Sequence, residues 1–140
     1  MLYLPPRLVQ TAYAEVTSNV STTSATYVDL APLTLTLSTI GNTSLEVHYS
    51  ACVEAVFAVP NIDFQLLVGG SVVMGATGNI LSFGNPGYTS CPSMRYKSGT
   101  LSAGSYIVKI QWRTSTGTAQ IRPANFIYGY GGLLVREVAV

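Results

Sequence analysis

Residues 33–38 of this chain read LTLTLS, and residues 106–113 read YIVKIQWR. In the first stretch every second residue is a leucine, and the residues between them carry hydroxyl groups. The second stretch repeats the spacing with larger side chains. A period of two is typical of a β-strand that buries one face. We therefore expect both stretches to be strands of a sheet with one buried face, and the core face of the second comprises Tyr106, Val108, Ile110 and Trp112.

Similar short runs recur along the chain and are separated by turns rich in glycine and proline. We expect strands near residues 12–17, 25–30, 33–39, 44–59, 63–68, 72–76, 93–101, 105–114, 118–123 and 133–138. Residues 40–42 and the pair Gly69-Gly70 indicate hairpin turns. About ten short strands at this spacing are typical of a sandwich or barrel. We predict an all-β fold, a two-sheet antiparallel β-sandwich with jelly-roll topology.

The composition is apolar for a protein without a membrane span. The chain has 140 residues, of which 48% are hydrophobic and 9% charged, whereas about 25% charged residues is usual. This length corresponds to one domain, and the hydrophobicity excludes a disordered chain. The apolar runs stop at Pro60 and Gly69, well short of the ~20 residues that cross a bilayer. The surplus indicates a hydroxyl-rich sandwich surface, a subunit interface depleted in charge, or both.

Charge and chemistry argue against several functions. The net charge is +1 and the basic residues are scattered, so we expect no nucleic-acid partner. We expect His48, the single histidine, to face solvent or an interface, opposite the apolar side chains of its strand. Glu46 and Ser50 lie two residues away along the same strand, about 7 Å each, so they are aligned with His48 rather than converging on it. The acidic residues contain no pair marked for glycoside hydrolysis. We predict that the protein is not an enzyme and expect no cofactor and no metal.

Cys52 and Cys91 leave two alternatives open. Two cysteines at this spacing are too few for a zinc site. If they are paired, they close a loop of about 40 residues and contribute on the order of 4 kcal/mol in the chain-entropy model. If they are reduced, Cys52 is simply a small core residue beside Ala51 and Val53.

The first residues form a separate segment. Pro5-Pro6 favours an extended chain that cannot join a sheet interior. We predict an extended N-terminal arm over residues 1–11 and a single β-sandwich domain over residues 12–140. The apolar side chains of the arm would be exposed unless they contact a neighbouring subunit or another surface. Those we expect to make such contacts are Leu2, Tyr3, Leu4 and Leu8.

Tyrosine is the enriched aromatic residue, with nine copies. Tyr88, Tyr128 and Tyr130 fall in glycine-rich stretches that read as loops. Tyrosines in such loops can bind sugars or protein surfaces. The alternative is that they cap the ends of the sandwich or pack at a subunit interface. We therefore count these three residues among the candidate partner contacts.

Several stretches carry a resemblance to a known group of proteins. Residues 24–30 (SATYVDL), followed by the LTLTL run, a hairpin at Gly41-Asn42 and a strand over residues 45–49, resemble the opening of small jelly-roll proteins of bacterial and archaeal viruses. Residues 101–113 (LSAGSYIVKIQWR) are similar to the L-S-A-G-x-h-x-V-x-h-x-W strand of those proteins, where h is apolar or histidine. Residues 133–138 (LLVREV) resemble their final L-x-V-x-E strand. The resemblance extends over about residues 16–138.

These viral proteins are similar to trimers of the C1q and tumour-necrosis-factor type and occur as capsid decoration proteins or tail-fibre heads. The resemblance implies a homotrimeric, non-enzymatic virion protein that binds the major capsid protein or another virion protein. Since the first six residues lack the features of a signal peptide, we expect synthesis in the host cytoplasm and a place on the virion surface. A chain of this length with an arm favours capsid decoration. The alternatives are a receptor-binding head of a tail fibre and a carbohydrate-binding module.

Overall fold

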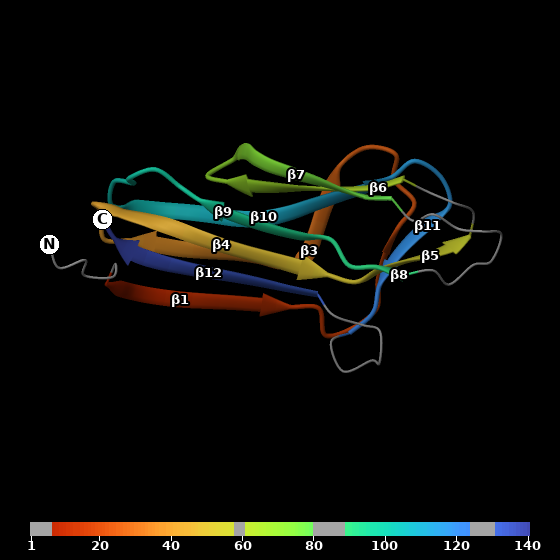
Figure 1. Ribbon diagram of the computed structural model, residues 1–140, viewed down its shortest axis with the longest axis horizontal. Helices are drawn as coiled ribbons and strands as arrows, with labels where there is room; N and C mark the ends of the chain where they lie inside the picture. The colour runs from red at the N-terminus through yellow and green to blue at the C-terminus, as the bar shows by residue number, and fades with distance from the viewer. Residues whose placement is uncertain (1–6, 58–60, 80–88, 124–130) are drawn as a thin grey trace, which may run out of the picture.

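The computed structural model describes residues 7–57, 61–79, 89–123 and 131–140. Within these ranges every regular element is a β-strand (Figure 1), and no helix is long and apolar enough to cross a membrane. The strands are β1 (Leu8–Glu15), β2 (Val20–Thr22), β3 (Val28–Thr39), β4 (Thr43–Ala51), β5 (Val53–Phe57), β6 (Asn61–Val68), β7 (Ser71–Asn79), β8 (Thr89–Ser90), β9 (Ser93–Lys97), β10 (Gly104–Thr114), β11 (Thr118–Ile121) and β12 (Gly131–Ala139).

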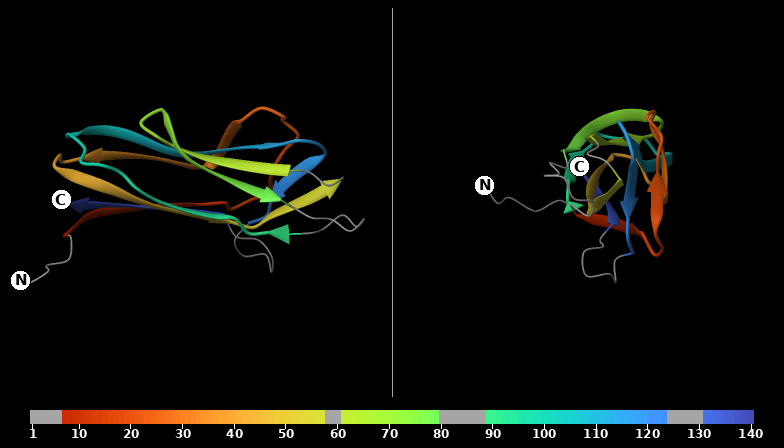
Figure 2. Two further views of the ribbon diagram at one scale, coloured as in Figure 1. Left: turned by 45° about the horizontal axis from the view of Figure 1, so that its top comes forward. Right: turned by 90° about the vertical axis from the view of Figure 1, so that its right-hand side faces the viewer.

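Two four-stranded sheets face each other, in the orders β1-β12-β4-β9 and β3-β10-β6-β7. A third small sheet, β2-β11-β5-β8, lies at the end of the sandwich far from the C terminus (Figures 1 and 2). All neighbouring strands are antiparallel. The predicted antiparallel jelly-roll sandwich is confirmed. The third sheet was not expected, because β2 and β8 are too short to produce an alternating pattern.

The core lies between the two larger sheets, and aromatic rings connect them. Trp112 of β10 is 1% exposed and its ring stacks on Phe64 of β6, with 6.2 Å between ring centroids. Phe64 in turn contacts Tyr49 of β4, in the opposite sheet, at 5.6 Å. Val108 and Ile110 are fully buried, as the alternation predicts, and Tyr106 packs against the same cluster while half-buried.

Strand β3 is continuous where the sequence predicts two strands. Its register against β10 shifts between Thr34 and Asp29. Leu30 and Leu33 are both fully buried across this irregularity, which contains Pro32. A proline cannot donate to the ladder and is tolerated at such a bulge. The expected break at Pro32 is therefore a bulge within one strand.

The hairpin predicted at residues 40–42 is wrong. Strand β3 pairs with β10, whereas β4 pairs with β12 and β9, so the turn crosses from one sheet to the other. Gly41 and Asn42 both have positive φ, 89° and 52°, which makes this crossing tight. Alternation shows that two strands are half-buried but not that they pair, and consecutive strands of a jelly roll commonly lie in opposite sheets. The hairpin at Gly69-Gly70, between β6 and β7, is confirmed.

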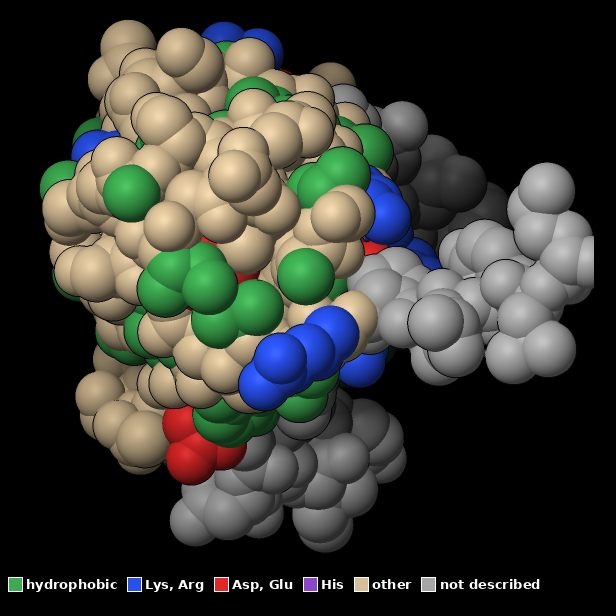
Figure 3. Space-filling view, turned by 90° about the vertical axis from the view of Figure 1, so that its left-hand side faces the viewer, with side chains coloured by type: hydrophobic (Ala, Val, Ile, Leu, Met, Phe, Trp, Pro, Cys, Tyr) green, Lys and Arg blue, Asp and Glu red, His purple; other side chains and the backbone are tan. Residues whose placement is uncertain are grey.

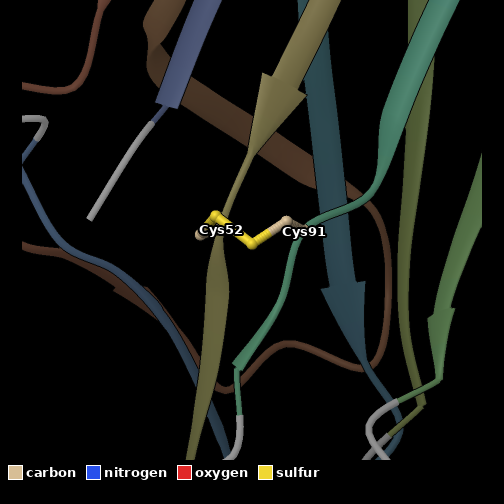
Figure 4. The surroundings of a disulfide bond; sticks show 2 residues. All are labelled: Cys52 and Cys91. Atoms are coloured by element: carbon tan, nitrogen blue, oxygen red, sulfur yellow. A yellow bond between two sulfur atoms is a disulfide. The ribbon is translucent and has the colours of Figure 1, made fainter. Parts of the chain in front are cut away.

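The long strand expected over residues 44–59 is divided into β4 and β5 at Cys52. Here Cys52 forms a disulfide with Cys91, 39 residues away, which answers the question that the sequence left open. Figure 4 shows the bond joining the β4–β5 junction to the segment before β9. The bond therefore lies where the chain passes from the main sheet, through β4, to the small third sheet, through β5.

The sandwich begins earlier than residue 12. Strand β1 starts at Leu8 and pairs with β12 from Leu8↔Val138 onward, with a bulge before Gln10. Residues 8–11 of the expected arm are therefore part of a sheet, where β12 supplies backbone partners that the sequence alone could not identify. Residues 1–6 of the arm lie outside the described residues.

Candidate functional site

The outer face of the sheet β1-β12-β4-β9 carries a histidine and charged side chains that have few partners within the described chain. In β4, Leu45, Val47 and Tyr49 point into the core, so Glu46 and His48 point outward. This orientation of His48 agrees with the sequence prediction. The same alternation operates in the neighbouring strands and produces one continuous polar face.

The registers arrange this face in rows across the four strands. One row runs Tyr13, Leu134, His48 and Arg95, from β1 to β9. The next row runs Thr11, Arg136, Glu46 and Lys97. Residues directly opposite each other in neighbouring strands have Cβ atoms about 5 Å apart. The face therefore gathers three cationic side chains and a histidine around a single carboxylate.

Two adjoining hollows lie on this face. The first has a volume of about 270 Å³ and is lined by Glu46, His48, Arg95, Tyr96, Lys97 and Arg136. The second, of about 330 Å³, is lined by Tyr13, His48, Tyr49, Ser50, Ser93, Met94, Arg95, Gly132 and Leu134. His48 and Arg95 belong to both. We call these two hollows together the cationic trough.

The positive charge of the trough is poorly compensated within the chain. Its single ion pair joins Lys97 Nζ to Glu46 Oε1 at 3.8 Å. Across the described residues, Arg95 and Arg136 make no ion pair, and the buried Nε of Arg136 has no hydrogen-bond partner. Leaving a buried donor unsatisfied costs about 1–3 kcal/mol. The arrangement is therefore suited to receive an anionic group.

His48 responds to these surroundings. Burial lowers its pKa below the ordinary value of 6.5, and the positive charges of Arg95 and Arg136 lower it further, while Glu46 opposes them. The imidazole is thus held neutral near pH 7. Ser50 lies at the next outward position of the same strand, so its hydroxyl is aligned with His48 along the strand and does not converge on it. The trough can therefore bind anionic groups and groups that form hydrogen bonds.

The other large sheet presents an outer face whose charges are paired. Lys109 lies 3.0 Å from Asp29, and Arg113 lies 2.9 Å from Asp63. The guanidinium of Arg113 also covers the ring of Tyr27, at 4.6 Å from its centroid. A face whose charges are paired with one another can be exposed to solvent without a binding partner. Of these two outer faces, the one that contains the trough is therefore the one with unpaired cationic side chains.

Glu137 is a buried acid that the sequence analysis did not single out. It is 0% exposed, and its carboxylate accepts hydrogen bonds from Thr43 Oγ1 (2.7 Å), the Ile40 backbone N–H (2.9 Å) and Gln10 Nε2. Burial acts to raise the pKa of Glu137, but these hydrogen bonds outweigh it and hold the pKa below its ordinary value. Glu137 thereby ties β12 to β1 and to the β3–β4 turn, a structural role.

The end of the sandwich beside the C terminus presents apolar side chains (Figure 3). Leu8 is 53% exposed, Ile40 67% and Val140 78%. Leu8 is the one predicted contact residue that the structure describes, and it lies here at the start of β1. The others, Leu2, Tyr3, Leu4, Tyr88, Tyr128 and Tyr130, lie outside the described residues.

Sequence reasoning missed Arg95 and Arg136. Both sit at outward positions of their strands, which alternation could show, but the register that places them beside His48 depends on long-range pairing. Within the ranges that the structure describes, no group of three or more His, Cys, Asp or Glu side chains could hold a metal ion.

Comparisons with known proteins bear on the fold. No protein-family model matches the sequence, and no curated protein matches it. Among solved structures, Eiger TNF from S. frugiperda is similar, with 11% identity, 97% of this chain and 94% of that chain covered, and a TM-score of 0.57. The infectious bursal disease virus Gx strain structure has 13% identity, 97% and 37% coverage, and a TM-score of 0.49. The protein has a jelly-roll β-sandwich fold similar to that of tumour-necrosis-factor proteins.

Proposed function

We propose that this protein is a non-enzymatic structural protein of a virion, a homotrimer that decorates the outside of the capsid. The main observation in favour of a homotrimer is that the outer faces of the two large sheets differ in how their charges are paired. The trough face leaves Arg95 and Arg136 without carboxylate partners in the described chain, whereas the face of β3-β10-β6-β7 pairs its own charges. Charges left unpaired on one subunit can be complemented by a neighbouring subunit, and such complementary charges fix the register of an interface.

The virion assignment is supported by the sequence. Residues 101–113 and 133–138 resemble strands of small viral jelly-roll proteins, and they form β10 and β12 at the centres of the two large sheets. The disulfide between Cys52 and Cys91 adds support, because such bonds persist outside the reducing cytoplasm. A decoration protein works on a released particle.

The decisive experiment locates the protein on particles. Virions produced in cells that express this chain should be purified, analysed for the protein, and imaged by electron microscopy with a specific antibody. We expect the label to cover the capsid, with the copy number a multiple of three. Label confined to the tail tips would replace decoration with the receptor-binding alternative. Complete absence from purified particles would refute the virion assignment.

A further inference from the structure

We propose that the cationic trough of one subunit receives Glu15 of the neighbouring subunit, so that the copies join head to tail. The inference rests on the proposed homotrimer and names the residues that would hold it together.

Of the six acidic residues in the chain, all described, only Glu15 has neither a cation partner nor a buried hydrogen-bond network. Its one recorded contact is a 3.5 Å hydrogen bond donated by the hydroxyl of Tyr13. Glu54, by comparison, lies 2.7 Å from Arg122. Among the cations, the described chain leaves Arg7, Arg95 and Arg136 without a carboxylate, and the last two line the trough.

Glu15 cannot neutralise these arginines within its own subunit. Arg95 lies on β9 and Glu15 on β1, which are the opposite edges of the sheet. Three strand spacings separate them, about 14 Å in all. Arg136 lies on the adjacent strand, but it pairs with Thr11, which is four residues or about 13 Å along β1 from Glu15.

The same placement suits a contact between two copies. The sheet has an acidic β1 edge and a cationic β9 edge on one face. A two-fold contact between like edges would join β1 to β1 or β9 to β9, so Glu15 and Arg95 would lie on different edges and would not meet. A head-to-tail contact instead joins the β1 edge of one copy to the β9 edge of the next, and three such contacts form a closed ring when each copy is rotated by a third of a turn.

Charge reversal tests this pairing in the full-length protein. The variants are Glu15→Arg, Arg95→Glu and the double exchange. Arg7→Glu serves as the matched control, because it reverses an equally unpaired cation that lies outside the trough. Trimer dissociation is measured by sedimentation velocity over a range of concentrations, and circular dichroism verifies that each variant is folded.

We expect Glu15→Arg and Arg95→Glu each to weaken assembly at least about tenfold, equivalent to about 1.4 kcal/mol, and the double exchange to restore most of the loss. Arg7→Glu should assemble like the wild type. A wild-type trimer whose double exchange is no better than the combined single variants would overturn the pairing while the homotrimer stands. Wild-type assembly of Glu15→Arg, together with phosphate binding that Arg95→Glu abolishes, would assign the trough to a free anion. A monomeric wild type would overturn both proposals.

Discussion

Replacing Glu137 should show how much one buried carboxylate contributes to the joining of three segments. Its Oε1 accepts from the Ile40 N–H and from Thr43, and its Oε2 accepts from Gln10. Glu137→Ala leaves all three donors without this acceptor in a site that is 0% exposed. Removing one partner of such a buried charged network costs about 3–5 kcal/mol, a large part of the roughly 5–15 kcal/mol that stabilises a typical domain.

Glu137→Gln is the more specific test, because it removes the charge and one hydrogen bond while keeping the shape of the side chain. The amide oxygen can still accept from Ile40 and Thr43, but the amide nitrogen would face the nitrogen of Gln10, which also donates to the Ser38 carbonyl at 2.8 Å. We expect a smaller loss, about 1–2 kcal/mol, for one hydrogen bond replaced by two facing donors.

The dependence of stability on pH separates the contribution of the charged carboxylate from that of its hydrogen bonds. Because the folded pKa of Glu137 is lowered from 4.5, its stabilising contribution is complete above that value and is lost as pH falls through the folded pKa. Urea unfolding should be followed at pH 7 and at several values below 4.5. We expect the wild type to lose stability more steeply with acid than Glu137→Gln. Equal acid slopes, or wild-type stability of Glu137→Ala at pH 7, would refute the structural role of the carboxylate.

Three further predictions concern the fold. Trp112→Ala should cost about 3–5 kcal/mol in urea unfolding, because a fully buried ring that stacks on the core is removed; wild-type stability would contradict its place in the core. Replacing Cys52 and Cys91 by serine should cost on the order of 4 kcal/mol for the 39-residue separation, and an unchanged thermal midpoint would argue that the bond is absent. Gly41→Ala should cost about 1–3 kcal/mol, since φ is +89° and a Cβ would meet backbone at 2.9 Å. Gly99→Ala, with open space around it, is the control and should be nearly neutral.

The sequence predicts the parts of this fold that depend on local pattern. The two-residue period identifies the strands and the inward side chains, including Val108, Ile110 and Trp112. This is possible because the burial of one face produces an alternating pattern within the sequence of a single strand. Glycine pairs identify the true hairpin at Gly69-Gly70. The pairing of strands depends on contacts far apart in the chain, which explains why the turn at residues 40–42 was misread as a hairpin.

The candidate site was less predictable for the same reason. His48 could be placed on an outward face from β4 alone. Its neighbours Arg95 and Arg136 come from β9 and β12, and only the registers bring the three together. Glu137 follows Leu133 and Val135 at the same spacing, which already indicates an inward carboxylate. Its hydrogen-bond donors come from other segments that no local pattern connects to it.

The central claim is that three copies of this chain assemble into a trimer, and the mass in solution tests it most directly. Sedimentation equilibrium of the full-length protein at micromolar concentration should give three times the chain mass of 14.9 kDa. Raising the ionic strength should weaken this trimer, because charges on its interface are screened by salt. A mass of one chain at every concentration, with the protein folded, would contradict the claim.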